Sequence, residues 1–139
     1  MPAGLDRLTG WVQALEAAGL DTSLVAFGDF SPASGMEAMR RLLADGRPID
    51  GLFAANDQMA AGAYSAIHEA GLSIPGDIAV VGYDDDNFGL MSTPPLTTVH
   101  QPSVRLGETM ARVLVRRMAG ESVERVTLLP TELVVRQST

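Results

Sequence analysis

The pattern of apolar and polar positions along the chain predicts strands and helices that alternate. Short unbroken apolar runs are typical of strands buried on both faces of a parallel sheet, and they occur at 24–27, 51–55 and 78–82. The segment 96–99, L-T-T-V, is also predicted to be a strand. Apolar residues spaced three and four apart predict amphipathic helices over 8–18, 35–44, 58–70 and 104–118. Two later runs indicate short strands at 126–129 and 132–135.

This alternation predicts an α/β fold with a parallel sheet, because strand–helix–strand units bring successive strands into parallel register. We expect Ser34 to cap the helix 35–44 and Asp57 to cap the helix 58–70. The segment 88–95 ends in two prolines and is expected to be a loop. The 139 residues are one domain's worth of chain.

Candidate binding residues lie where the predicted strands end, which is where ligands bind in open α/β sheets. Asn56, Asp84 and Gln101 each follow a predicted strand. Arg7 lies at the start of the first predicted helix, and Phe30 lies in the loop after the first predicted strand. Carboxylate, guanidinium and amide groups hydrogen-bond to hydroxyls on adjacent carbons of a ligand, and an aromatic face covers the ligand's apolar C–H surface. The set therefore suits a sugar or another compact polar metabolite.

Four of these residues also have a structural interpretation that the pattern alone leaves open. Arg7 can be a surface charge, Phe30 a core aromatic, and Asn56 a partner for local backbone groups. Asp84 can belong to a solvated acidic turn with Asp85 and Asp86.

Composition excludes several functions. The formal net charge of −7 argues against a surface that contacts DNA, because phosphate binding uses clustered Lys and Arg. All ten basic residues are arginines, so chemistry that needs a lysine amine has no residue to perform it. Without cysteine there is no disulfide, no thiolate nucleophile and no cysteine-bound metal. No secretory leader or membrane-spanning run is recognisable, so a cytoplasmic protein is expected.

Neither the acidic stretch 84–86 nor the rest of the chain contains a complete metal-binding or enzyme motif. Asp84 and Asp86 have the first spacing of a calcium loop, but Phe88 and Pro95 stand where further ligands belong. No G-x-S-x-G or G-x-G-x-x-G motif occurs. We expect no metal, no cofactor and no enzyme activity.

Five motifs together resemble the effector-binding core of lac-repressor-type (LacI/GalR) transcriptional regulators. In chain order they are R-L-T-G-W at 7–11, A-N-D-Q-M-A-A-G-A at 55–63, I-P-G-D-I-A-V-V-G-Y-D-D at 74–85, P-P-L-T-T-V at 94–99 and L-L-P-T-E-L-V-V-R at 128–136. The resemblance implies a three-layer, periplasmic-binding-protein-like α/β sandwich, of which this chain is the carboxyl-terminal subdomain. It implies effector contacts at Arg7, Asn56 and Asp84, an aromatic contact at Phe30, and a further pocket position at Gln101.

The resemblance also implies what lies outside this chain. Such regulators begin with a DNA-binding headpiece and the amino-terminal half of a two-lobed core, which are absent here. The helix 104–118 is expected to belong to the missing lobe. A homodimer interface is expected near the helix that starts at Gln58 and the segment 88–95, with exposed Leu90 and Met91. Without a neighbouring strand upstream of Arg7, the chain is expected to oligomerise or swap segments, and to bind effector weakly.

Two alternatives remain open at this point. A periplasmic sugar-binding protein shares the two-lobed architecture, and an α/β enzyme could use Asp84 as its base. The resemblance favours a sugar-responsive regulator that contacts DNA only through its headpiece and does not bind membranes.

Overall fold

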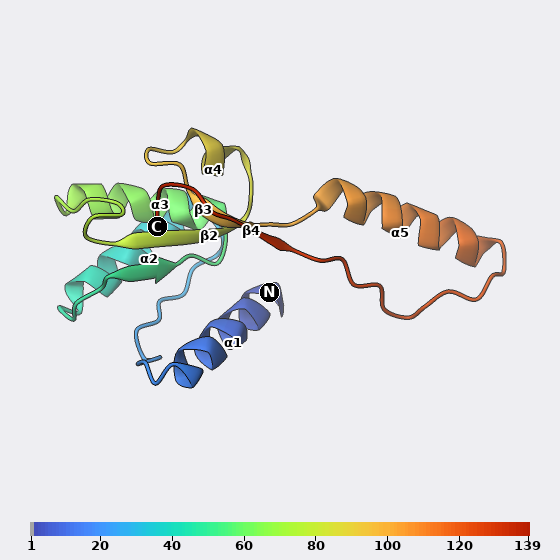
Figure 1. Cartoon of the computed structure of the whole chain (residues 1–139), viewed down its shortest axis with the longest axis horizontal. Coiled ribbons are helices and arrows are strands. Elements are labelled where there is room, and N and C mark those ends of the chain that lie inside the picture. The colour runs from blue at the N-terminus through green and yellow to red at the C-terminus, as the bar shows by residue number, and fades with distance from the viewer. Residues whose placement is uncertain (1) are drawn as a thin grey trace.

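The computed structural model describes residues 2–139 and shows five helices and four strands (Figure 1). In chain order they are α1 (Pro2–Ala17), α2 (Pro32–Ala44), β1 (Gly51–Phe53), α3 (Asp57–Glu69), β2 (Ala79–Asp84), α4 (Asn87–Met91), β3 (Thr97–His100), α5 (Ser103–Met118) and β4 (Glu132–Val134). None of these helices has the length and apolar character needed to cross a lipid bilayer.

The four strands form one sheet in the order β1-β2-β3-β4. β1, β2 and β3 are parallel, and β4 pairs with β3 in the antiparallel direction. Asp84, at the end of β2, lies opposite His100 at the end of β3. The predicted α/β fold with a mostly parallel sheet is confirmed.

The core lies between the sheet and the helix pair α2 and α3. On β2, Val80 and Gly82 face α3 and are buried, whereas Val81 and Tyr83 face the other side and are half-buried. The side chains with almost no exposure come from both layers and include Met39, Ile67, Ile78, Val80 and Leu96. Arg7 of α1 lies over the ring of Tyr83, so α1 approaches the opposite face and makes the third, thinner layer.

Two glycines let α2 and α3 cross at very short range. A methyl group on Gly62 would overlap the carbonyl oxygen of Pro32, and one on Gly35 would overlap the backbone of Met59. The helices therefore pack backbone against backbone, which a larger side chain at either position would prevent.

Both predicted helix caps are displaced from their expected positions. Ser31, not Ser34, caps α2, because Pro32 fits the first helical position and the Ser31 hydroxyl accepts a hydrogen bond from the Ser34 amide. Asn56, not Asp57, caps α3 by accepting a hydrogen bond from the amide of Met59 at 2.9 Å. Asp57 is instead fully buried within the protein.

Three predicted segments differ in the structure. Residues 24–27 are extended but form no strand, because they lie across a cavity from β1 rather than beside it. Residues 126–129 also form no strand, since their side chains are largely exposed and no neighbouring strand pairs with them. The segment 88–95 contains most of the short helix α4, whose amino end is capped by Asp86.

Helix α5 projects away from the sheet together with the segment that leads back to β4 (Figure 1). None of its residues is buried, and its apolar side chains Val104, Met110, Leu114, Val115 and Met118 are largely exposed. The expectation that this helix packs against another lobe stays a prediction.

Candidate functional site

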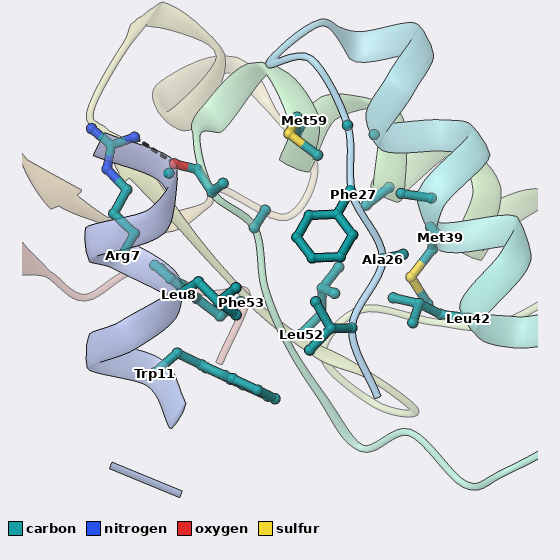
Figure 2. Close-up of a pocket in the computed structure, with 18 of the residues that line it drawn as sticks. Arg7, Leu8, Trp11, Ala26, Phe27, Met39, Leu42, Leu52, Phe53 and Met59 are labelled. Carbon is teal, nitrogen blue, oxygen red and sulfur yellow. Dashed lines mark hydrogen bonds between the residues drawn. The ribbon is translucent and has the colours of Figure 1, made fainter. Parts of the chain in front are cut away.

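Arg7 joins the carboxyl ends of two neighbouring strands. Its Nη1 donates a hydrogen bond to the carbonyl oxygen of Ala55, just past β1, at 2.5 Å. Its Nη2 donates to Oδ1 of Asp84, the last residue of β2, at 3.3 Å. Figure 2 shows the Arg7 side chain reaching from α1 to the backbone at the end of β1. The guanidinium of Arg7 therefore lies at the carboxyl-end edge of the sheet, where the candidate residues were expected to meet.

The guanidinium of Arg7 is also stacked on an aromatic ring. Its Cζ lies 3.7 Å from the centroid of the Tyr83 ring, a cation–π distance. Only 14% of the Arg7 side chain is exposed, against 39% of the Asp84 side chain. The cation is held in place on three sides, whereas the carboxylate remains partly open to solvent.

The pKa of Asp84 is raised above its ordinary value of 3.8 because burial disfavours the charged carboxylate. The nearby Arg7 opposes this effect through its charge and its hydrogen bond. Asp84 therefore carries a charge that is only partly compensated, and hydroxyl groups of a ligand could donate hydrogen bonds to it.

Asn56 and Phe30 are connected to one another next to this edge. The side-chain Nδ2 of Asn56 donates a hydrogen bond to the carbonyl oxygen of Phe30 at 3.1 Å. Because its Oδ1 caps α3, both polar atoms of Asn56 already have partners, and the residue is only 7% exposed. The Asn56 side chain therefore already serves as a partner for local backbone groups, although one N–H of Nδ2 has no partner within the described residues. Phe30 has a φ of 72°, a left-handed conformation that is uncommon outside glycine.

A cavity of about 900 Å³, lined mostly by polar and charged residues and called the polar cavity below, opens beside Asp84. It lies between the end of the sheet, the start of α5 and residues 127–129, and Gln101 lines it together with Asp84, Asp85 and His100. The backbone N–H of Gln101 makes a long hydrogen bond, 3.5 Å, to the backbone carbonyl oxygen of Asp84. Asp84 and Gln101 therefore share one cavity.

A second cavity, of about 320 Å³, lies on the other side of Arg7 and is mostly apolar. Arg7 and Phe30 line it, together with residues 24–28 and β1. Figure 2 shows Leu8 and Trp11 of α1 beside Phe53, and the ring of Phe27 lying toward Leu52. Asn56 lines neither cavity. The structure thus brings Arg7 and Asp84 into contact, with Asn56 and Phe30 adjacent to them and Gln101 beside Asp84 in the wall of the polar cavity.

Sequence reasoning missed several residues around the site. Tyr83 supports Arg7, and its position directly before Asp84 was the available signal. Asp57 accepts hydrogen bonds from the Thr98 hydroxyl at 2.6 Å and from the Asp86 amide at 2.9 Å. Arg136 binds Asp85, which is 51 positions away in the chain, and no local pattern predicts that contact.

The arrangement supports hydrogen bonding to a ligand. Within residues 2–139, no group of three or more acidic or histidine side chains is placed to hold a metal ion. What this edge of the sheet offers is a fixed guanidinium bound to a partly exposed carboxylate, and a polar cavity beside that carboxylate.

Comparison with known proteins gives the family. A model of the periplasmic binding protein-like domain matches residues 2–139. The chain belongs to this family. The transcriptional regulator CelR of Thermobifida fusca is 46% identical to it over 141 residues, which cover 99% of this chain and 42% of CelR. The ribose operon repressor of Escherichia coli K12 is 40% identical over 136 residues, covering 96% of this chain and 41% of the repressor.

Solved structures of LacI-type regulators agree with this assignment. A CelR–cellobiose complex has a TM-score of 0.91 and 45% identity, covering 97% of this chain and 42% of that one. A dimeric lac repressor with an 11-residue C-terminal deletion has a TM-score of 0.91 and 39% identity, covering 96% and 49%. These relatives are transcriptional regulators rather than enzymes, and the predicted resemblance to the LacI family is confirmed. The periplasmic binding protein-like chain spans less than half the length of each.

Proposed function

We propose that this chain is the effector-sensing and dimer-forming part of a LacI-type transcriptional regulator, and that the effector is a sugar. The observation that carries the proposal is the contact between Arg7 and Asp84 where two parallel strands end, beside a polar cavity. Ligands of open α/β sheets bind at this edge. The similarity to CelR, which has been solved with cellobiose, supports a sugar.

The proposed site recognises hydroxyl groups through a mixture of charges and amides. Asp84 accepts hydrogen bonds from sugar hydroxyls, and Arg7 donates to a sugar oxygen while its guanidinium stays stacked on Tyr83. Gln101, which lines the same cavity beside Asp84, contributes its side-chain amide. Phe30 offers an aromatic face from the apolar cavity that Arg7 also lines, and Asn56 holds the Phe30 backbone in place.

The wider functions of the regulator follow from its relatives. The lac repressor structure is dimeric, and Leu90 and Met91 of α4 are 66% and 82% exposed, as expected of an interface not yet covered. We propose a homodimer through this region, DNA contact through a headpiece outside this chain, and a cytoplasmic location, where the DNA is. Effector binding would shift the dimer between DNA-binding and non-binding arrangements.

Thermal unfolding of the full chain with a panel of sugars, including cellobiose and ribose, tests the proposal. A ligand that binds only the folded chain stabilises it by about 1.4 kcal/mol at ten times its Kd. We expect at least one sugar to raise the midpoint. In Asp84→Asn, and to a smaller extent in Gln101→Ala, we expect the rise to be reduced or lost.

Asp77→Asn is the matched control, because Asp77 lies just before the other end of β2 and its carboxylate accepts only from Ser73. It should keep the response to sugar. A rise that persists unchanged in Asp84→Asn would contradict the proposal.

A further inference from the structure

Two consecutive aspartates adopt backbone conformations that L-residues rarely adopt. Asp84 has a φ of 112° and Asp85 a φ of 60°, both in the positive range that favours glycine. Each such residue costs about 1–3 kcal/mol and persists only where the surroundings enforce it. The chain keeps side chains at both positions, so contacts made by these side chains must hold the turn.

The carboxylate of Asp85 is bound on both oxygens. Arg136 Nη2 lies 2.6 Å from Oδ1, and His100 Nδ1 lies 3.0 Å from Oδ2. Arg136 is itself fixed to the start of β3, where its Nη1 donates to the carbonyl oxygen of Leu96 at 2.8 Å. The side chains of Arg136 and Asp85 are only 13% and 17% exposed. We call this group, Asp85 with Arg136 and His100, the Asp85 clamp.

The clamp separates two neighbouring carboxylates that would otherwise compete for one cation. Asp84 pairs with Arg7, and Asp85 pairs with Arg136. The next residue, Asp86, is fastened by its backbone amide to the buried Asp57. Each of the three aspartates in the turn therefore has its own binding partner, and the three partners come from different parts of the chain.

The two aspartates also differ in their protonation. Burial raises the pKa of Asp85, but hydrogen bonds from Arg136 and His100 outweigh it and hold that pKa below the ordinary value of 3.8. Burial raises the pKa of Asp84, and Arg7 does not fully compensate. Asp85 is thus the firmly ionised member of the pair, whereas the carboxylate of Asp84 can still accept hydrogen bonds from a ligand.

We propose that Asp85 is a positioning residue for the effector, because its clamp to Arg136 and His100 holds the left-handed turn that directs the Asp84 carboxylate at Arg7 and the polar cavity. The inference rests on the proposed function, since it assigns Asp85 a role in presenting Asp84 to the ligand. Asp85 itself acts through Asp84 and Arg7 and needs no contact with the sugar.

The test compares Asp85→Asn and Asp85→Gly in the full chain. Asparagine and glycine both tolerate a positive φ, so these variants remove the charge on the clamp without adding backbone strain. The first readout needs no ligand: the NMR signal of the Arg7 Nε–Hε group, assigned by its loss in Arg7→Met, reports the stacking on Tyr83 and the contact with Asp84. The second readout is the affinity for cellobiose by calorimetry.

Ser138→Ala is the matched control for stability. Ser138 is buried, and its hydroxyl donates to the carbonyl oxygen of Val80 and accepts from the amide of Thr97 in the same sheet. The Ser138 hydroxyl makes no hydrogen bond with the side chains of Asp85, Arg136 or His100. Its loss should therefore destabilise the fold while leaving the Arg7 signal and the cellobiose affinity unchanged.

We expect both Asp85 variants to move the Arg7 signal toward that of Asp84→Asn and to weaken cellobiose binding about tenfold. The double variant, Asp85→Asn with Arg136→Met, should bind cellobiose no more weakly than Asp85→Asn alone. Both substitutions break the same contact, the ion pair between Asp85 and Arg136. An unchanged Arg7 signal in both Asp85 variants would overturn the inference. If the unsubstituted chain does not bind cellobiose, that result contradicts cellobiose as the effector and leaves the inference about Asp85 to be judged by the Arg7 signal alone.

Discussion

Replacing Gly62 by alanine tests whether α2 and α3 really pack backbone against backbone. A methyl group at this position would overlap the carbonyl oxygen of Pro32 and approach the amide of Met36. The helices would have to separate, because the obstructing atoms are backbone atoms that cannot turn aside. The crossing lies close to the site, since α2 follows Phe30 and α3 begins after Asn56.

The expected cost follows from two opposing effects. Overpacking in a rigid interior costs about 1–3 kcal/mol, and backbone overlap places Gly62→Ala near the upper limit. Alanine is favoured over glycine within a helix by about 1 kcal/mol. We therefore expect a net loss of about 2 kcal/mol, which lowers the melting temperature of a chain of this size by about 6 to 8 °C.

Urea unfolding followed by circular dichroism measures this effect, with Gly10→Ala as the matched control. Gly10 also lies within a helix, but a methyl group there meets nothing within 4 Å. The control should be neutral or slightly stabilising. If Gly62→Ala proves as stable as the control, the close crossing of α2 and α3 is not what holds the two helices together.

Two further predictions concern the core and the response to acid. Ile67→Ala truncates a fully buried side chain of α3. It should lower the free energy of unfolding, measured in urea, by about 2–5 kcal/mol. A loss below about 1 kcal/mol would show that Ile67 does not lie in a tightly packed core. Because the pKa of Asp85 is depressed in the folded chain, its ionised form stabilises the fold above the ordinary value of 3.8, and this contribution is lost as the pH falls through the depressed pKa. The stability advantage of the unsubstituted chain over Asp85→Asn should therefore shrink on acidification in a series of unfolding curves, and an advantage that grows instead would contradict the assignment.

Much of the fold could be predicted from the sequence because its signals are local. The apolar runs that became β1, β2 and β3 are bounded by polar residues and glycine, and apolar spacing marked the positions of α1, α3 and α5. The segment 24–27 was predicted as a strand for the same reasons. Its apolar pattern describes an extended chain, but a strand also needs a neighbour, and no pattern within the segment supplies one.

The candidate site was predictable only as a set of positions. Asn56 and Asp84 were found because they follow strands directly, yet the detailed use of Asn56 as a helix cap depended on a one-residue choice between it and Asp57. The contact of Arg7 with the ends of both β1 and β2 joins residues 48 and 77 positions apart. Contacts at that separation are set by tertiary packing, so the supporting roles of Tyr83 and Arg136 became visible only in three dimensions.

The central claim is that Arg7 and Asp84 form one sugar-binding edge of the sheet. A crystal structure of the full chain with the sugar that most raises its melting temperature tests it most directly. We predict sugar hydroxyls within hydrogen-bonding distance of the Asp84 carboxylate, with the Arg7 guanidinium still stacked on Tyr83. A sugar bound elsewhere, with no ligand atom near Asp84, would contradict the claim.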